Sequence, residues 1–61
     1  MNRTAYITCW GNKYKVVVKG FDKSWIVGSF EYKDNPKSKK WAYGGPEGYF
    51  PINRITYLRY I

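Results

Sequence analysis

The stretch GYFPINRI, residues 48–55, places a proline and an asparagine in a tail that is otherwise largely aromatic and aliphatic as far as Ile61. Proline has no amide hydrogen, so Pro51 cannot join the hydrogen-bond ladder of a central strand. Residues 51–54 are therefore predicted to form one turn of 3₁₀ or irregular structure that leads into a closing strand at residues 55–61. Two other interpretations stay open: the stretch is the aromatic floor of a ligand groove, or its pattern is a coincidence of composition.

β-Branched and aromatic residues dominate the segments before this turn, and no stretch keeps the apolar spacing of an amphipathic helix over ten or more residues. The run at 44–48 contains three glycines and a proline and is predicted to turn, and residues 34–40 are predicted to form an exposed loop. Strands are predicted at residues 4–10, 14–19, 25–33, 41–43 with a continuation at 49–50, and 55–61. We expect residues 1–61 to form a single all-β domain, a small five-stranded and partly open barrel, because closure removes the exposed edges of a sheet.

Alternation along the strands predicts which side chains share a face. In the strand at 14–19 one face is apolar and the other carries lysines, so the buried face is clear. It comprises Tyr14, Val16 and Val18. In the strand at 4–10 both faces are candidates for the core. They are Ala5, Ile7 and Cys9 on one side and Tyr6, Thr8 and Trp10 on the other. The closing strand is predicted to place Ile55 and Tyr57 on the same face.

The charge is strongly unbalanced. Eleven Lys and Arg residues face four Asp and Glu residues, giving a net charge of +7. Such a balance in a short chain favours an anionic partner, and nucleic acid is the commonest one. The simpler interpretation is that the charge keeps an aromatic surface soluble. No apolar run approaches the roughly 20 residues of a membrane span, so no membrane is expected among the partners. A free cysteine without a pair fits a cytoplasmic location.

The chain offers little for catalysis. It has no histidine, and Cys9 is its only cysteine, so an intrachain disulfide and a histidine-based metal site are both excluded. The four carboxylates are scattered, and no base accompanies the thiol. We therefore expect a protein that is not an enzyme, has no cofactor and no metal, and uses Cys9 as a small buried apolar residue. The glycine run at 44–48 lacks the spacing of a phosphate-binding loop.

Residues 41–55, WAYGGPEGYFPINRI, resemble the second half of Src-homology-three (SH3) domains. In that family a strand-initiating Trp is followed by a Gly-containing turn and then by Gly-aromatic-apolar-Pro-x-Asn-Tyr-Val. The resemblance implies an SH3-like barrel in which the Pro and Asn belong to a 3₁₀ turn before the last strand. It also implies that Trp41 and Pro51 help to form the floor of a groove for proline-rich peptides.

The sequence departs from the family pattern at functional positions. Arg54 stands where the family has a groove tyrosine, the opening Ala-Leu-Tyr-Asp-Tyr motif is absent, and so is the acidic loop that pairs with basic peptide residues. A cation at the edge of the groove favours an anionic ligand over a proline-rich peptide.

Basic residues interleaved with aromatic rings are the most informative pattern in the chain. Cations neutralise phosphates, and exposed rings give unpaired bases a stacking surface. The candidate binding residues are Trp10, Lys13, Lys15, Lys37, Lys39, Lys40, Trp41, Tyr43, Tyr49 and Arg54. Arg3 and Arg59 lie near the termini and are expected to be solvated. The sequence thus predicts a small basic module that binds nucleic acid, DNA or RNA.

Two alternatives compete with this prediction. One is a protein-interaction module or inhibitor, of phage or mobile-element origin, that docks on an acidic partner protein. The other is a binder of proline-rich peptides. A homodimer is compatible with each of them, with residues 14–19 as an edge strand that pairs with its twin.

Overall fold

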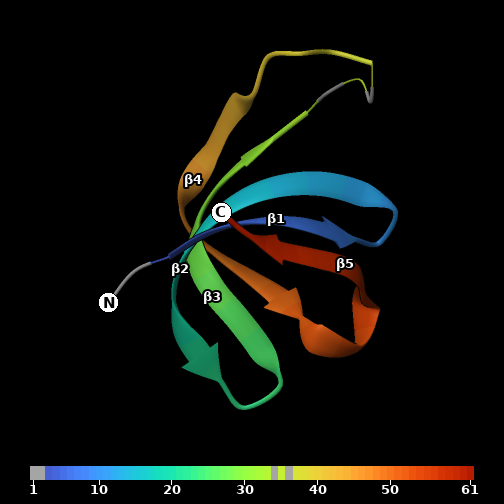
Figure 1. Cartoon of the computed structure of the whole chain (residues 1–61). Coiled ribbons are helices and arrows are strands. Elements are labelled where there is room, and N and C mark those ends of the chain that lie inside the picture. The colour runs from blue at the N-terminus through green and yellow to red at the C-terminus, as the bar shows by residue number, and fades with distance from the viewer. Residues whose placement is uncertain (1–2, 34, 36) are drawn as a thin grey trace.

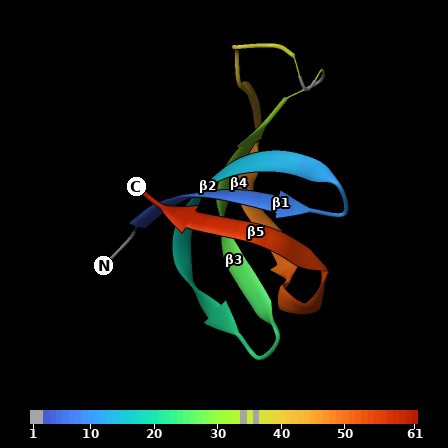
Figure 2. The same ribbon diagram turned by 45° about the vertical axis from the view of Figure 1, so that its right-hand side comes forward.

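The structure is a computed structural model that describes residues 3–33, 35 and 37–61. Its strands are β1 (Arg3–Cys9), β2 (Asn12–Asp22), β3 (Trp25–Tyr32), β4 (Ala42–Pro51) and β5 (Ile55–Tyr60), and a 3₁₀ turn, η1 (Ile52–Arg54), joins the last two. They form one antiparallel sheet in the order β4-β3-β2-β1-β5 (Figure 1). The sheet is strongly twisted, so that β1 and β5 run across the direction of β3 (Figure 2). The predicted all-β fold and the 3₁₀ turn after Pro51 are confirmed.

The sheet is open, with β4 and β5 as its two edges. β2 lies between β1 and β3 and is paired along both sides. The prediction that residues 14–19 form an edge strand for homodimerisation is therefore wrong. No helix in the described ranges is long and apolar enough to span a membrane.

The first hairpin has a two-residue turn at Trp10 and Gly11, which both have positive φ angles, 51° and 74°. This backbone twist matches the right-handed twist of the flanking strands. The strand after the turn consequently begins at Asn12, where the sequence predicted a turn through residues 11–13. The amide of Trp10 donates a hydrogen bond to the carbonyl oxygen of Arg54 at 3.3 Å, which ties this turn to η1.

The core lies on one face of the sheet. Its buried residues are Ala5, Ile7, Cys9, Val16, Val18, Ile26 and Phe50, and Tyr14, Phe30, Ile55 and Tyr60 pack against them. The apolar face predicted for β2 is thus confirmed, and β1 buries its Ala, Ile and Cys face. Phe50 contacts Tyr14 and Phe30 with ring centroids 4.9 and 5.6 Å apart, and such pairs add roughly 0.5–1.5 kcal/mol beyond burial.

The predicted turn at residues 44–48 is wrong, because these residues lie inside β4. The glycines there allow a close approach and do not mark a turn. A Cβ atom at Gly44 or at Gly48 would overlap the Phe30 ring of the neighbouring strand. The two glycines let the β4 backbone pass directly over that ring, with register shifts on either side of Phe30.

A β-bulge at Thr56 changes the faces of the closing strand. Cys9 lies opposite Ile55 and Thr8 lies opposite Tyr57, so Thr56 is the extra residue. Ile55 therefore faces the core while Tyr57 lies on the outer side of the sheet. The prediction that the two share a face is wrong for this reason.

The connection between β3 and β4 carries the predicted lysine loop. Within it Lys37, Lys39 and Lys40 are exposed. Asp34 and Pro36 of the predicted loop lie outside the described residues.

Candidate functional site

The face of the sheet that points away from the core, here the outer face, carries rows of aromatic and basic side chains across three strands. Since β1 buries Ala5, Ile7 and Cys9, the residues between them point outward. Tyr6 lies opposite Arg59 of β5 on one side and Lys15 of β2 on the other. In the next row Thr8 lies between Tyr57 and Lys13. Side chains directly opposite on antiparallel strands are neighbours, so the register alone brings rings and cations together.

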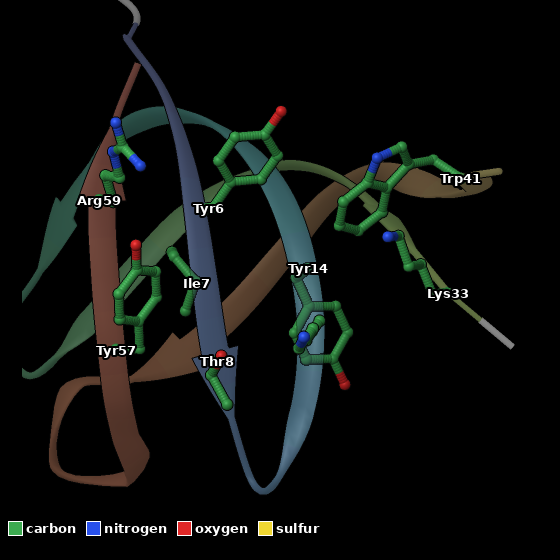
Figure 3. A pocket seen from close by; sticks show the side chains of 9 residues that line it. Tyr6, Ile7, Thr8, Tyr14, Lys33, Trp41, Tyr57 and Arg59 are labelled. Carbon is green, nitrogen blue, oxygen red and sulfur yellow. The ribbon is translucent and has the colours of Figure 1, made fainter. Parts of the chain in front are cut away.

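These rows form the floor of a groove of about 530 Å³, the outer groove (Figure 3). Its lining residues are Tyr6, Thr8, Lys13, Lys33, Trp41, Tyr57 and Arg59, together with Ile7 and Tyr14 of the core side. The volume falls within the roughly 300–1,000 Å³ of sites that enclose small ligands.

One wall of the outer groove comes from the two ends of the β3–β4 connection. Trp41 stacks on Tyr6 with ring centroids 5.9 Å apart and ring planes inclined by 22°. The Lys33 ammonium lies 4.7 Å from the centroid of the Trp41 ring, a cation–π distance. Figure 3 shows Trp41 and Lys33 together, facing Tyr6. A residue that precedes β4 is thus held against a residue of β1 by ring stacking.

Local hydrogen bonds shape the connection that leads to Trp41. The amide of Lys37 donates to the side-chain oxygen of Asn35 at 3.0 Å, and the amide of Ser38 donates to the Asn35 carbonyl oxygen at 2.8 Å. The Lys40 amide donates to the Ser38 hydroxyl oxygen at 3.2 Å. These short-range bonds bend the backbone just before Trp41, where the sequence places the exposed lysines.

The electrostatics of the outer groove are one-sided. Lys13, Lys33 and Arg59 line it, and none of its nine lining residues, all of which the structure describes, is acidic. The nearest carboxylate in the register belongs to Glu31, which lies opposite Lys15 on β3 and borders a separate hollow of about 100 Å³. The lining of the outer groove is therefore positively charged, and such a lining attracts anions.

The structure distributes the sequence-predicted residues over several places. Lys13 and Trp41 line the outer groove. Lys15 and Tyr43 border the smaller hollow beside Glu31. The exposed loop carries Lys37, Lys39 and Lys40, while Trp10 occupies the first hairpin turn and Arg54 ends η1. Tyr49 lies on β4 opposite Val27 and packs edge-on against Trp25, with centroids 6.4 Å apart.

Seven of the nine groove residues were not among the predicted ones: Tyr6, Ile7, Thr8, Tyr14, Lys33, Tyr57 and Arg59. A signal existed for Tyr6, because strand alternation places it opposite a face of Ala, Ile and Cys. For Arg59, expected to be merely solvated, the signal was its position two residues after Tyr57, which puts both on one face of a strand. Nothing local marks Lys33, which reaches the groove only through its contact with Trp41.

The peptide groove implied by the family resemblance is not formed. Trp41 lines the outer groove, whereas Pro51 is buried at the far end of β4 opposite Trp25. β4 runs without a turn between the two residues, and Pro51 does not line the outer groove.

Cys9 and the carboxylates form no reactive or metal-binding group within the described chain. Burial raises the pKa of the Cys9 thiol, which disfavours the nucleophilic thiolate at neutral pH. No cluster of three or more Cys, Asp or Glu residues that could hold a metal ion occurs among the residues that the structure describes.

Comparison with known proteins identifies no relative. No protein-family model matches the chain, and no curated protein and no solved structure is significantly similar to it. Function is therefore inferred from the outer groove itself.

Proposed function

We propose that this protein is a small, non-enzymatic binding module that takes nucleic acid into the outer groove. The observation that carries the proposal is the lining of that groove, which combines Lys13, Lys33 and Arg59 with aromatic rings and contains no carboxylate. Nucleic acid matches both halves of this chemistry, because its phosphates need cations and its bases offer flat faces to rings.

The overall charge supports the same ligand. The net charge of +7 attracts a polyanion from a distance, and the exposed Lys37, Lys39 and Lys40 extend the basic surface beyond the groove wall at Trp41. A groove of rings that binds a cation, such as a methylated lysine, usually relies on ring faces without competing positive charge. The three groove cations disfavour that class of ligand.

The topology supports the proposal that the fold is SH3-like. A meander of four strands is followed by a 3₁₀ turn and a last strand that returns to pair with the first. This likeness concerns architecture, and fold and function separate readily. The separation of Trp41 from Pro51 weighs against recognition of proline-rich peptides.

The proposal is tested by the salt dependence of oligonucleotide binding. We expect affinity to fall as salt rises, with a slope of log K against log salt of about −2 to −3.5 if three to five phosphates are neutralised. The Lys13→Gln and Lys33→Gln variants should each weaken binding and reduce the slope by about 0.7. Fluorescence anisotropy of a labelled oligonucleotide measures both quantities.

Lys23→Gln is the matched control. Lys23 is also exposed, but it lies in the β2–β3 turn and does not line the outer groove. Its loss should change affinity much less than the loss of Lys13. Equal effects of the three substitutions would mean that only the total charge matters, and absence of binding at low salt would refute the proposal.

A second candidate function is docking on an acidic protein partner, and one observation favours it. Trp25 and Tyr49 form an exposed ring pair, with 40% and 50% of their surfaces accessible. Trp25 begins β3 while Lys33 follows its end, so this pair lies roughly 25 Å from the outer groove along the strand. Exposed aromatic residues are typical anchors of protein interfaces. A partner retained by the wild type after nuclease treatment of a lysate, and lost with Trp25→Ala, would support this function.

A further inference from the structure

Resting on the proposed function, we infer that the outer groove selects unpaired nucleotides, with a base stacked on Tyr57 and the adjoining phosphate at Arg59. The shape of the groove indicates which kind of nucleic acid is bound, and the geometry of β5 indicates which residue contacts the base.

The shape of the site favours single strands over a double helix. Proteins reach the base edges of a duplex by inserting a protruding helix or β-ribbon into a groove of the DNA. Here the rings and cations line a depression of about 530 Å³ in the protein. The faces of bases in a duplex are covered by their neighbours, so only a base that has left the stack can enter this depression and lie against a ring.

Tyr57 is the ring best placed to receive that base. It is 50% exposed and lies on the outer face opposite Thr8, a small side chain that leaves the ring uncovered on that side. Among the described residues, Trp41 already stacks on Tyr6, whereas Tyr57 takes part in none of the stacked or edge-on ring pairs. Its position results from the bulge at Thr56, which turns Tyr57 out of the core.

Arg59 supplies the anion-binding partner on the same strand. Residues two apart on a strand point to the same side and lie roughly 7 Å apart, and both side chains are seen on the groove side of β5 in Figure 3. A guanidinium binds phosphate through two parallel hydrogen bonds. With a base on the Tyr57 ring and its phosphate at Arg59, the bound strand would run along β5 toward Tyr6, which lies opposite Arg59.

The test compares a short labelled thymidine oligonucleotide with a duplex of the same length, both at about 50 mM salt. We expect the single strand to bind more tightly. Tyr57→Ala should weaken its binding about 5- to 150-fold, the range for loss of one stacking contact. Tyr57→Phe, which keeps the ring, should stay close to the wild type, while Tyr57→Leu, which keeps the apolar bulk but not the π face, should behave like Tyr57→Ala.

Tyr49→Ala provides the matched control, because Tyr49 is equally exposed, at 50%, and lies on the other edge strand away from the groove. It should leave binding nearly unchanged. The Leu and Phe variants preserve the bulk of the side chain, so they decide the outcome even if Tyr57→Ala lowers stability.

The results separate this inference from the proposed function. Duplex binding as tight as that of the single strand, or equal affinities for the Leu and Phe variants, would overturn the inference while leaving a nucleic-acid-binding protein. Failure of the wild type to bind either oligonucleotide would overturn both.

Discussion

At the scale of single residues, Gly11 is a position where the backbone conformation, and no steric contact, favours glycine. Its φ of 74° lies in the left-handed region, and a Cβ atom there would meet nothing within 4 Å. Gly11→Ala should therefore cost about 1–2 kcal/mol of stability through backbone strain, with no steric contribution. Gly20→Ala is the control, because its Cβ would also be free of contacts and its φ is not left-handed. Urea unfolding measures both, and a similar loss for the two variants would contradict this account.

Cys9 illustrates a residue whose chemistry is suppressed by its surroundings. The side chain is fully buried, and burial raises the pKa of the thiol. Both effects slow reaction with iodoacetamide, because the reagent needs access and attacks the thiolate. We expect alkylation of the native protein to be at least about tenfold slower than that of the urea-unfolded chain. Mass spectrometry follows the reaction, and equal rates in the two states would show that Cys9 is accessible.

At the scale of the elements, β4 shows how glycine can serve a strand. Gly44→Ala would push a methyl group into the Phe30 ring, which Gly48 contacts as well, so the ring has little room to move. We expect a loss of about 1–3 kcal/mol in the free energy of unfolding. Gly45→Ala should be nearly neutral, since its Cβ would lie 3.6 Å from Phe30, an ordinary contact. Equal unfolding midpoints for the two variants would be inconsistent with a close approach at Gly44.

The sequence predicted those elements whose signals are local and failed for those that depend on another strand. The 3₁₀ turn follows from Pro51 itself, and the faces of β2 follow from its lysines, because both signals are local. The glycine-rich composition of residues 44–48 suggests a turn. Gly44 and Gly48 are instead required because the Phe30 ring of another strand leaves no room for a Cβ atom. The bulge at Thr56 depends on the register with β1. Such tertiary constraints cannot be recognised from the segment they act on alone.

At the scale of the whole molecule, the outer groove joins segments that are distant in the chain. Tyr6 of β1 and Trp41 before β4 form one ring stack, and Tyr57 and Arg59 are supplied by β5. Interleaved charges and rings predicted a surface of basic and aromatic residues, and two of the predicted residues, Lys13 and Trp41, line the outer groove. The neighbours of Lys13 required the strand order, because only the pairing of β1 with both β2 and β5 places Lys13, Thr8 and Tyr57 in one row. Trp41 is positioned by a tertiary contact, its stacking on Tyr6.

The two open edges of the sheet differ in their ability to pair with another strand. β4 contains Pro46 and Pro51, which lack amide hydrogens, and a side-chain bond from Lys19 to the Pro46 carbonyl oxygen at 3.1 Å occupies one of its acceptors. Proline at an edge discourages association with a further strand. β5 (Ile55–Tyr60) contains no proline. A second copy of the chain would therefore find β5 the more accessible edge.

The cations of the outer groove are lysine and arginine, and the chain contains no histidine. Histidine is the side chain that ordinarily changes charge between about pH 5 and 8. A ligand held by this groove is consequently not released by mild acidification, as it would be from a histidine-gated site. If the groove binds nucleic acid as proposed, dissolved ions, which compete with its cations for phosphate, are the variable that controls occupancy.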